Sequence, residues 1–314
     1  MAHLWSRPLR VIALGWLLIS GGPGAPGGLA RVSARDAPAP VAFTFAWPQG
    51  LSATVRFHRE KGPPQGRKEA IAATWVLEAQ RVGGGLRIVT TGTKWTPPPS
   101  SQHALDIARG VERVAPILSR DGQVRRVEGL EELDRLLGAD VERRHVSSAD
   151  AARMVQLGHL AMDQEVRELW SMLVGAWAGQ SFQLGKTWTR TVRAAPSIDP
   201  SAEVDFMVTS VVARRVLCRR GERQARCVEA RYTSDAHPGD IAAVLRRSGA
   251  PEEIVRDVTL GSEAVVVTDP QTLVPRSLVL TKRGRLPVRR GAGWVMDEWV
   301  DRSEYRYHCR SSGD

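Results

Sequence analysis

Residues 53–60 read ATVRFHRE, and the alternation of apolar and polar residues in this stretch predicts a β-strand. Val55 and Phe57 alternate with Arg56 and His58, so one side of the segment is apolar and the other is polar. Successive side chains of a strand point to opposite faces, and a strand with this pattern buries one face. Such a strand needs partners, and the residues around it supply them.

The flanking segments predict a series of neighbouring strands. Residues 41–47 alternate in the same way and end at a Pro-Gln-Gly turn, and residues 71–81 and 86–95 lie on either side of three consecutive glycines. Turns of this composition between alternating segments are typical of hairpins. The first third of the chain therefore predicts an antiparallel meander.

The middle of the chain is predicted to be helical after one hairpin. Asp121-Gly122 is centred in residues 117–127 and favours a tight hairpin turn there. A short helix is expected over residues 130–137, and a long one over about 149–177 with Ser148 as its cap. The long helix carries apolar residues at helical spacing, namely Val155, Met162, Val166, Leu169, Leu173 and Trp177.

The remainder of the chain returns to strands. The segments expected to be extended are residues 182–192, 204–218, 227–233, 264–268, 277–282 and 294–307, with a helix over 240–247. Strands, then helices, then strands predict an α+β fold. We expect one domain over residues 41–314, with a large curved antiparallel sheet, resembling a half-barrel, and helices packed on one of its faces.

Two short motifs resemble a family of uncharacterised bacterial secreted or lipid-anchored proteins. Val127-Glu128-Gly129 leads into a helix, and Phe182 to Trp188 (FQLGKTW) is similar to the family's V-x-x-G-D-x-W strand. Leu184 stands in place of the valine and Lys186 in place of the aspartate, and the cysteine of a lipid anchor is missing. The resemblance implies no activity. A curved sheet crossed by a helix is also similar to periplasmic lipoprotein carriers, which shelter acyl chains in their concavity.

The N-terminus predicts export. Arg7 and Arg10 precede a short apolar run over residues 11–19, and small residues follow, as in a signal peptide. Cleavage after Ala30 or Ala34 fits this pattern, and we take residues 1–34 as the signal peptide. The alternative is an uncleaved N-terminal membrane anchor.

Export places the mature protein in the periplasm or outside the cell. Residues 35–40 are expected to be a linker, and no transmembrane segment is expected in the mature chain. Loss of the leader removes three arginines and no acid, so the formal charge falls from +10 to +7. The 39 arginines and 5 lysines reflect a compositional bias and do not indicate a specific nucleic-acid partner.

Basic residues gather in two predicted hairpins. A solvated surface or contact with an anionic membrane, lipopolysaccharide or an acidic partner would explain them. The first group is Arg219, Arg220, Arg223 and Arg226. The second, which we assign as candidate anionic contacts, is Arg276, Lys282, Arg283, Arg285, Arg289 and Arg290.

Three cysteines predict one disulfide bond. Cys218 and Cys227 flank a short loop, and a hairpin would place them directly opposite each other, within reach of a disulfide. An oxidising compartment favours this bond. We therefore predict a Cys218–Cys227 disulfide and leave Cys309 without a role.

No catalytic residue, metal or cofactor is expected. His159 and Asp163 have the spacing of two metal ligands, but a core histidine is the simpler interpretation. Asp297, Glu298 and Asp301 lie near two tryptophans, as in sugar hydrolases, but a solvated strand end explains them as well.

Three functions are compatible with these features. The first is a non-enzymatic exported binding protein for a lipophilic or amphipathic ligand held between sheet and helix, with a cavity lined by Val155, Met162, Val166 and Trp177. The second is a structural or interaction module of the cell envelope that uses the basic hairpins. The third is a hydrolase of unknown type.

Overall fold

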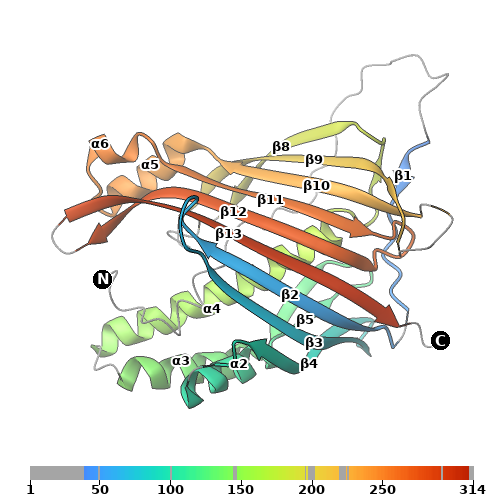
Figure 1. The fold of residues 1–314 in the computed structure, drawn as a ribbon, viewed down its shortest axis with the longest axis horizontal. Coiled ribbons are helices and arrows are strands. Elements are labelled where there is room, and N and C mark those ends of the chain that lie inside the picture. Colours follow the sequence, from blue (N-terminus) through green and yellow to red (C-terminus); the bar gives the residue numbers. More distant parts are fainter. Residues whose placement is uncertain are drawn as a thin grey trace.

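The computed structural model of this chain describes residues 39–310, apart from 49, 100, 144–146, 195, 197–201, 219–223, 225 and 291–292. The predicted signal peptide and most of the predicted linker lie outside the described residues. The described part consists mainly of antiparallel strands with a smaller group of helices (Figure 1), so the predicted α+β fold is confirmed.

Eleven strands form a single antiparallel sheet in the described part of the chain, in the order β6-β5-β4-β3-β2-β13-β12-β11-β10-β9-β8. Strands that are consecutive in this sheet are neighbours in the chain except at one place, where β2 pairs with β13. This pairing joins the first meander to the last. The strands are β2 (Ser52–Gly62), β3 (Glu69–Val82), β4 (Gly85–Thr96), β5 (Ala115–Leu118), β6 (Val124–Glu128), β8 (Thr187–Ala194), β9 (Val204–Val216), β10 (Cys227–Ala236), β11 (Thr259–Thr268), β12 (Pro275–Arg290) and β13 (Gly293–Arg310).

Two short strands, β1 (Val41–Ala42) and β7 (Ser181–Phe182), pair separately. The helices are α2 (Gln102–Arg113), α3 (Leu130–Arg143), α4 (Ser148–Trp170), α5 (Pro238–Arg247) and α6 (Glu252–Val255). A π-helical turn, η1 (Ser171–Gly175), continues α4. The cap of α4 is Ser147 and not Ser148, because the Ser147 side chain accepts the hydrogen bond from the backbone N–H of Asp150.

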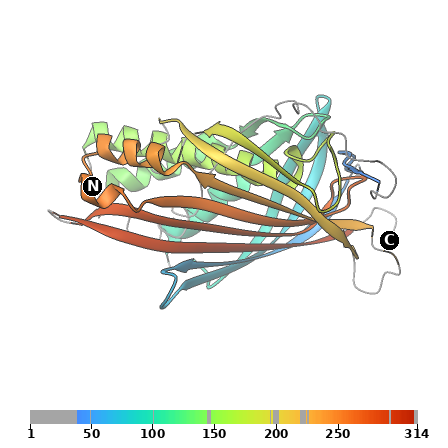
Figure 2. The ribbon, with the colours of Figure 1, turned by 90° about the horizontal axis from the view of Figure 1, so that it is seen from above.

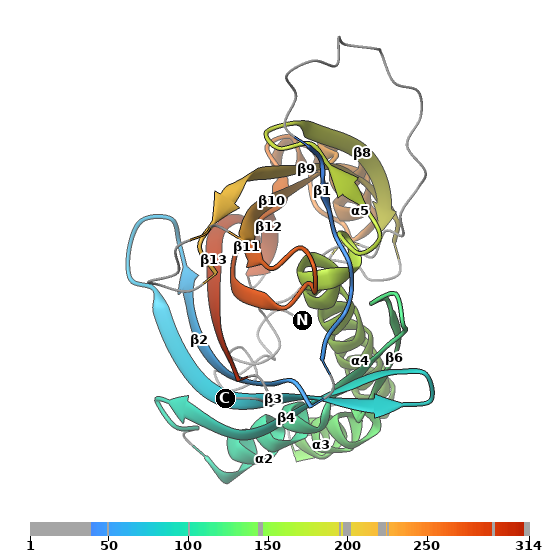
Figure 3. The same cartoon turned by 90° about the vertical axis from the view of Figure 1, so that its right-hand side faces the viewer.

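The sheet is strongly curved, and α4 lies along the open side of the curve (Figure 3). α3 packs beside α4, and α2 contacts α3 and β4. α5 and α6 lie at the other half of the sheet, beside β11 and β12 (Figures 1 and 2). α4 is therefore the helix that faces the concave surface of the sheet.

Burial alternates along the strands and identifies the concave face. In β2 and β13 the odd-numbered residues point inward, and in β11 and β12 the even-numbered ones do. Val55 and Phe57 are almost fully buried, which confirms the face predicted from their alternation. The same alternation continues to Arg59 in β2 and to Asp301 in β13, so it directs charged side chains into the interior.

The apolar stripe predicted on the long helix is divided between two cores. Leu173 and Trp177 lie in the main core, which spans most of the sheet. Met162 packs in a smaller cluster with α2 and α3, around Ile107 and Leu133. Val166 touches both clusters. Within α4, Met162 thus faces the neighbouring helices, whereas Leu169 packs against the main core.

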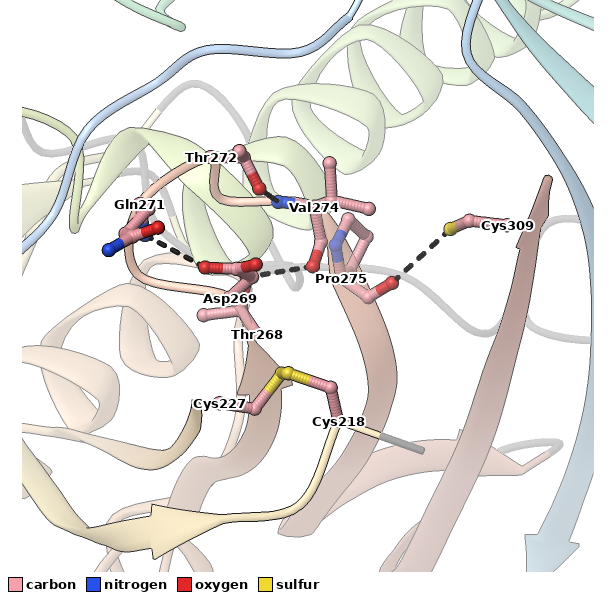
Figure 4. The surroundings of a disulfide bond; sticks show 9 residues. All are labelled: Cys218, Cys227, Thr268, Asp269, Gln271, Thr272, Val274, Pro275 and Cys309. Atoms are coloured by element: carbon pink, nitrogen blue, oxygen red, sulfur yellow. Dashed lines mark hydrogen bonds between the residues drawn. A yellow bond between two sulfur atoms is a disulfide. The ribbon is translucent and has the colours of Figure 1, made fainter. Parts of the chain in front are cut away.

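The predicted disulfide is present. Cys218 and Cys227 are bonded, with a Cα–Cα distance of 5.0 Å (Figure 4). The register differs from the expected one, because Cys227 pairs with Val216 and Cys218 lies two residues beyond the end of β9. The bond therefore links a strand end to the segment that follows β9. Cys309 is outside the disulfide, and its Sγ lies 3.8 Å from the carbonyl oxygen of Pro275.

Loss of this disulfide should destabilise the protein moderately. Replacing both Cys218 and Cys227 with alanine removes the constraint on a loop of about ten residues, which is expected to lower the free energy of unfolding by roughly 2–3 kcal/mol. Urea denaturation measures the change, and Cys309→Ala is the matched control. Equal stability of the double variant and the control would contradict the prediction.

Candidate functional site

A row of polar side chains crosses the concave face. The strand register places Ser234, Ser262, Lys282, Asp301 and Lys61 side by side on β10, β11, β12, β13 and β2. The first four are less than 5% exposed, and Lys61 is half-buried. Polar groups at such positions need hydrogen-bonding or ionic partners, because an unpaired buried charge is costly.

Two buried ion pairs supply partners for Asp301 and Lys282. Arg59 on β2 donates from Nε and Nη2 to the two carboxylate oxygens of Asp301 on β13, at 2.8 and 2.6 Å. Lys282 Nζ on β12 lies 2.9 Å from Glu168 Oε2 on α4. All four residues are at most 5% exposed. The second pair connects the helix to the sheet through charge.

Glu165 lies one helical turn before Glu168 and is equally buried. Burial raises the pKa of its carboxyl group well above the ordinary value, and the nearby carboxylates of Glu168 and Asp301 raise it further. Lys282 and Arg59 oppose the shift without cancelling it. Glu165 therefore keeps its proton to a higher pH than an ordinary glutamate.

Tyr305 borders the same group of charges. Its ring packs against Phe57, with ring centroids 5.0 Å apart, and meets Trp75 edge-on at 6.4 Å. Its buried hydroxyl has no hydrogen-bond partner among the described residues. Burial, together with the charge of Glu165, raises the pKa of Tyr305 well above the ordinary value. Its hydroxyl therefore stays protonated and can donate or accept a hydrogen bond.

Half-buried tryptophans extend the aromatic surface. Trp75 and Trp95 lie on the inward positions of β3 and β4, and Trp299 lies on that of β13. Trp299 covers Gly284 so closely that a Cβ there would lie 2.8 Å from its ring. Lys61 Nζ sits 5.5 Å from the centroid of the Trp299 ring, a cation–π arrangement. Burial lowers the pKa of Lys61 to about 8, although Asp301 opposes the shift.

The sheet-facing side of α4 is partly apolar. Met154, Leu157 and Ala161 precede Glu165 and Glu168 at helical spacing and share their side. All three are half-buried, and neither of the two apolar clusters of the described residues includes them. The half-buried tryptophans of the sheet, in contrast, pack against the main core.

The predicted cavity residues lie elsewhere. Met162 packs against α2 and α3, Trp177 is 1% exposed in the main core, and Val155 approaches Gly138 of α3. Val166 lies between the two clusters.

The predicted basic face requires one correction. Lys282 is buried and paired with Glu168, because it occupies an inward position of β12. Arg283 and Arg285 occupy outward positions and are exposed, and Arg276 is half-buried. The side chains of Arg289 and Arg290 lie outside the described residues, as do Arg219, Arg220 and Arg223.

The other candidate residues have local partners. His159 Nδ1 lies 2.7 Å from Asp134 Oδ2 on α3, whereas Asp163 pairs with Arg167. Among the described residues, no group of three or more His, Cys, Asp or Glu side chains could hold a metal ion. No described helix combines the length and the apolar character needed to cross a membrane.

Comparison with known proteins gives a distant structural likeness and no family. No protein-family model matches the chain, and no curated protein matches it. Among solved structures, it is similar to one described as "lipid-protein interactions in lipovitellin", with 8% identity and a TM-score of 0.44. The likeness covers 84% of this chain and 25% of that one, so this chain spans about a quarter of its length.

Proposed function

We propose that this protein is a non-enzymatic, exported binding protein for a lipophilic or amphipathic ligand. The ligand lies between α4 and the concave face of the sheet. Its apolar part contacts the sheet-facing side of α4 and the half-buried tryptophans, and its polar part approaches the charged centre around Glu165. The observation that carries the proposal is that Met154, Leu157 and Ala161 face the sheet without joining either core.

The energetics favour a bound apolar molecule at these positions. Burying about 100 Å² of exposed apolar surface stabilises a complex by roughly 2.5 kcal/mol. A continuous helix side and several indole rings together offer more apolar surface than this to a ligand. The ion pairs Arg59–Asp301 and Lys282–Glu168 keep four of the buried charges in fixed positions, which suits orienting a ligand.

Leu157→Asp is expected to weaken ligand binding strongly. A charged side chain on the sheet-facing side of α4 should lower the affinity for a fluorescent acyl-chain probe by about tenfold or more. The matched control is Met207→Asp, because Met207 lies on the outer face of β9 and is 57% exposed. Probe titration of the wild type and both variants measures the effect.

The outcomes separate the candidate functions. Loss of binding in Leu157→Asp alone supports the proposal. Equal binding by both variants, or no binding by the wild type, would refute it. The second result would favour an envelope interaction module that uses exposed residues such as Arg283 and Arg285.

A further inference from the structure

The two edges of the large sheet differ in how they are protected. At one edge, β6 has five residues, and its pairing with β5 shifts in register between Ile117 and Leu118. Arg167 of α4 also donates from Nη1 to the Val124 carbonyl of this strand, at 3.1 Å. Short strands, irregular register and covering groups are means by which proteins prevent an open edge from pairing with another chain. The β6 edge is therefore protected.

The opposite edge is formed by β8, which lies at the rim of the sheet (Figures 1 and 3). Its eight residues pair with β9 without a register shift from Thr187 to Ala194. They read TWTRTVRA, which is rich in residues that favour strands and contains no proline or lysine. In an antiparallel pair, every second residue directs its N–H and C=O away from the partner strand. Among the described residues, none forms a hydrogen bond with these outer groups of β8.

The two faces of β8 restrict which strand can be added to it. Thr187, Thr189 and Thr191 are exposed on the convex face of the sheet, whereas Trp188 is half-buried and Val192 buried on the concave face. Directly opposed residues of an antiparallel pair lie on the same face. An added strand must therefore carry polar residues on one face and apolar residues on the other. A second copy of β8 has this alternation.

Charge selects one register for two copies of β8. Because opposed residues share a face, the pairing must be centred on a residue and not between two. Centres at Arg190 and Thr191 pair residues 187–193 and 188–194, seven of the eight in each case. The first places Arg190 opposite itself, which is repulsive. The second places Thr191 opposite itself, Arg190 opposite Val192 and Arg193 opposite Thr189, so no like charges are directly opposed.

We propose that this protein forms a dimer in which the β8 strands of two copies pair antiparallel, centred on Thr191. The two large sheets then form one continuous sheet. Arg193 lies 3.4 Å from Glu203 and 3.7 Å from Asp205, so its charge is offset within its own copy. The dimer does not depend on the ligand, because Thr191 lies on the convex face and α4 on the concave one. One pair of short strands makes a small interface, so the dimer should dissociate on dilution.

Opposite charges at the centre of the pairing test the proposal. Thr191→Lys and Thr191→Glu each place like charges opposite one another, which should raise the dissociation constant of the dimer by about fivefold or more. An equimolar mixture of the two variants should dimerise at least as well as the wild type, because lysine then faces glutamate. Sedimentation velocity of the protein over a concentration series measures association. The control is Thr74→Glu, an exposed position on the interior strand β3, which should leave association unchanged.

A disulfide cross-link tests the register itself. In a Cys309→Ala background, Thr191→Cys places two thiols opposite each other, with Cα atoms roughly 4.5–5.5 Å apart and within reach of a disulfide. Mild oxidation should yield a covalent dimer. Thr189→Cys is the matched control, because each cysteine would face Arg193 of the second copy and lie too far from its counterpart.

Three results would overturn the proposal. They are a wild type that stays monomeric up to about 100 μM, unchanged association of both Thr191 variants, and equal cross-linking through positions 189 and 191. Binding of the acyl-chain probe is a separate readout and should be the same in Thr191→Lys as in the wild type. Failure of the dimer would therefore leave the proposed ligand site standing.

Discussion

Lys282→Met is expected to lower the free energy of unfolding by about 3–5 kcal/mol. Lys282 and Glu168 are each 4% exposed, and their side chains lie 2.9 Å apart. Removing the ammonium group leaves a buried carboxylate without its cation, beside a second buried acid at Glu165. The penalty comes from this unpaired charge and not from lost volume, because methionine nearly fills the same space. Urea denaturation at neutral pH measures the change.

Two further variants separate the buried charge from a general effect of substitution in β12. Arg283→Met replaces the exposed neighbour and should change stability by no more than about 0.5 kcal/mol. Lys282→Met combined with Glu168→Gln should recover much of the loss, since no unpaired charge remains. If Lys282→Met and Arg283→Met lower the free energy of unfolding by similar small amounts, Lys282 is exposed to solvent and the prediction is contradicted.

Trp177→Ala is expected to cost about 3–5 kcal/mol of unfolding free energy. The Trp177 ring lies 5.8 Å from that of Phe43 and 5.6 Å from that of Phe182, and its Nε1–H donates to the Met172 carbonyl at 2.6 Å. Alanine leaves a large cavity and one buried carbonyl without its donor. Thermal and urea denaturation report the loss.

Met162→Ala is the companion variant, with an expected cost of about 2–5 kcal/mol in the smaller helical cluster. Binding of the acyl-chain probe should be similar in both variants at temperatures where they are folded. If either variant keeps its stability and loses probe binding, that residue lines the ligand site, as first expected from the helical stripe.

Much of the sheet was predictable because alternation is a local property. The segment around Val55 and Phe57 indicated its buried face, and Asp121-Gly122 indicated a hairpin that the structure contains. The same alternation also indicates that a charged residue points into the interior. Arg59 follows Val55 and Phe57 at the same spacing, so an inward arginine needing a partner could have been inferred. Its partner, Asp301, could not, because the pairing of β2 with β13 joins distant segments.

The orientation of α4 was harder to predict. An apolar stripe shows which side of a helix is buried but not which neighbour covers it. α4 is buried on two sides, with Met162 toward α2 and α3 and with Glu165 and Glu168 toward the sheet. The second side combines apolar residues with two glutamates, so its pattern alone does not mark it as buried. Its burial depends on Lys282 and Arg59, which lie on distant strands.

The prediction of a single basic face in β12 needed correction for a related reason. Counting charges along the chain groups Lys282 with Arg283 and Arg285, whereas a strand separates even from odd positions. The register sends Lys282 to the interior and the two arginines to the outer surface. A cluster of charges in an extended segment is therefore two clusters, one for each face.

The pairing of β2 with β13 also determines when the sheet can be completed during folding. Arg59 and Asp301 are 242 residues apart in the chain, so β2, the first long strand to be synthesised, cannot pair with β13 until the last strand is made. Until then, both strands have an open edge that can pair with other molecules. Contacts between such distant segments also slow folding. The early strands of such a chain therefore need protection until β13 is made. Loss of the C-terminal strand would leave the two halves of the sheet as separate, aggregation-prone pieces.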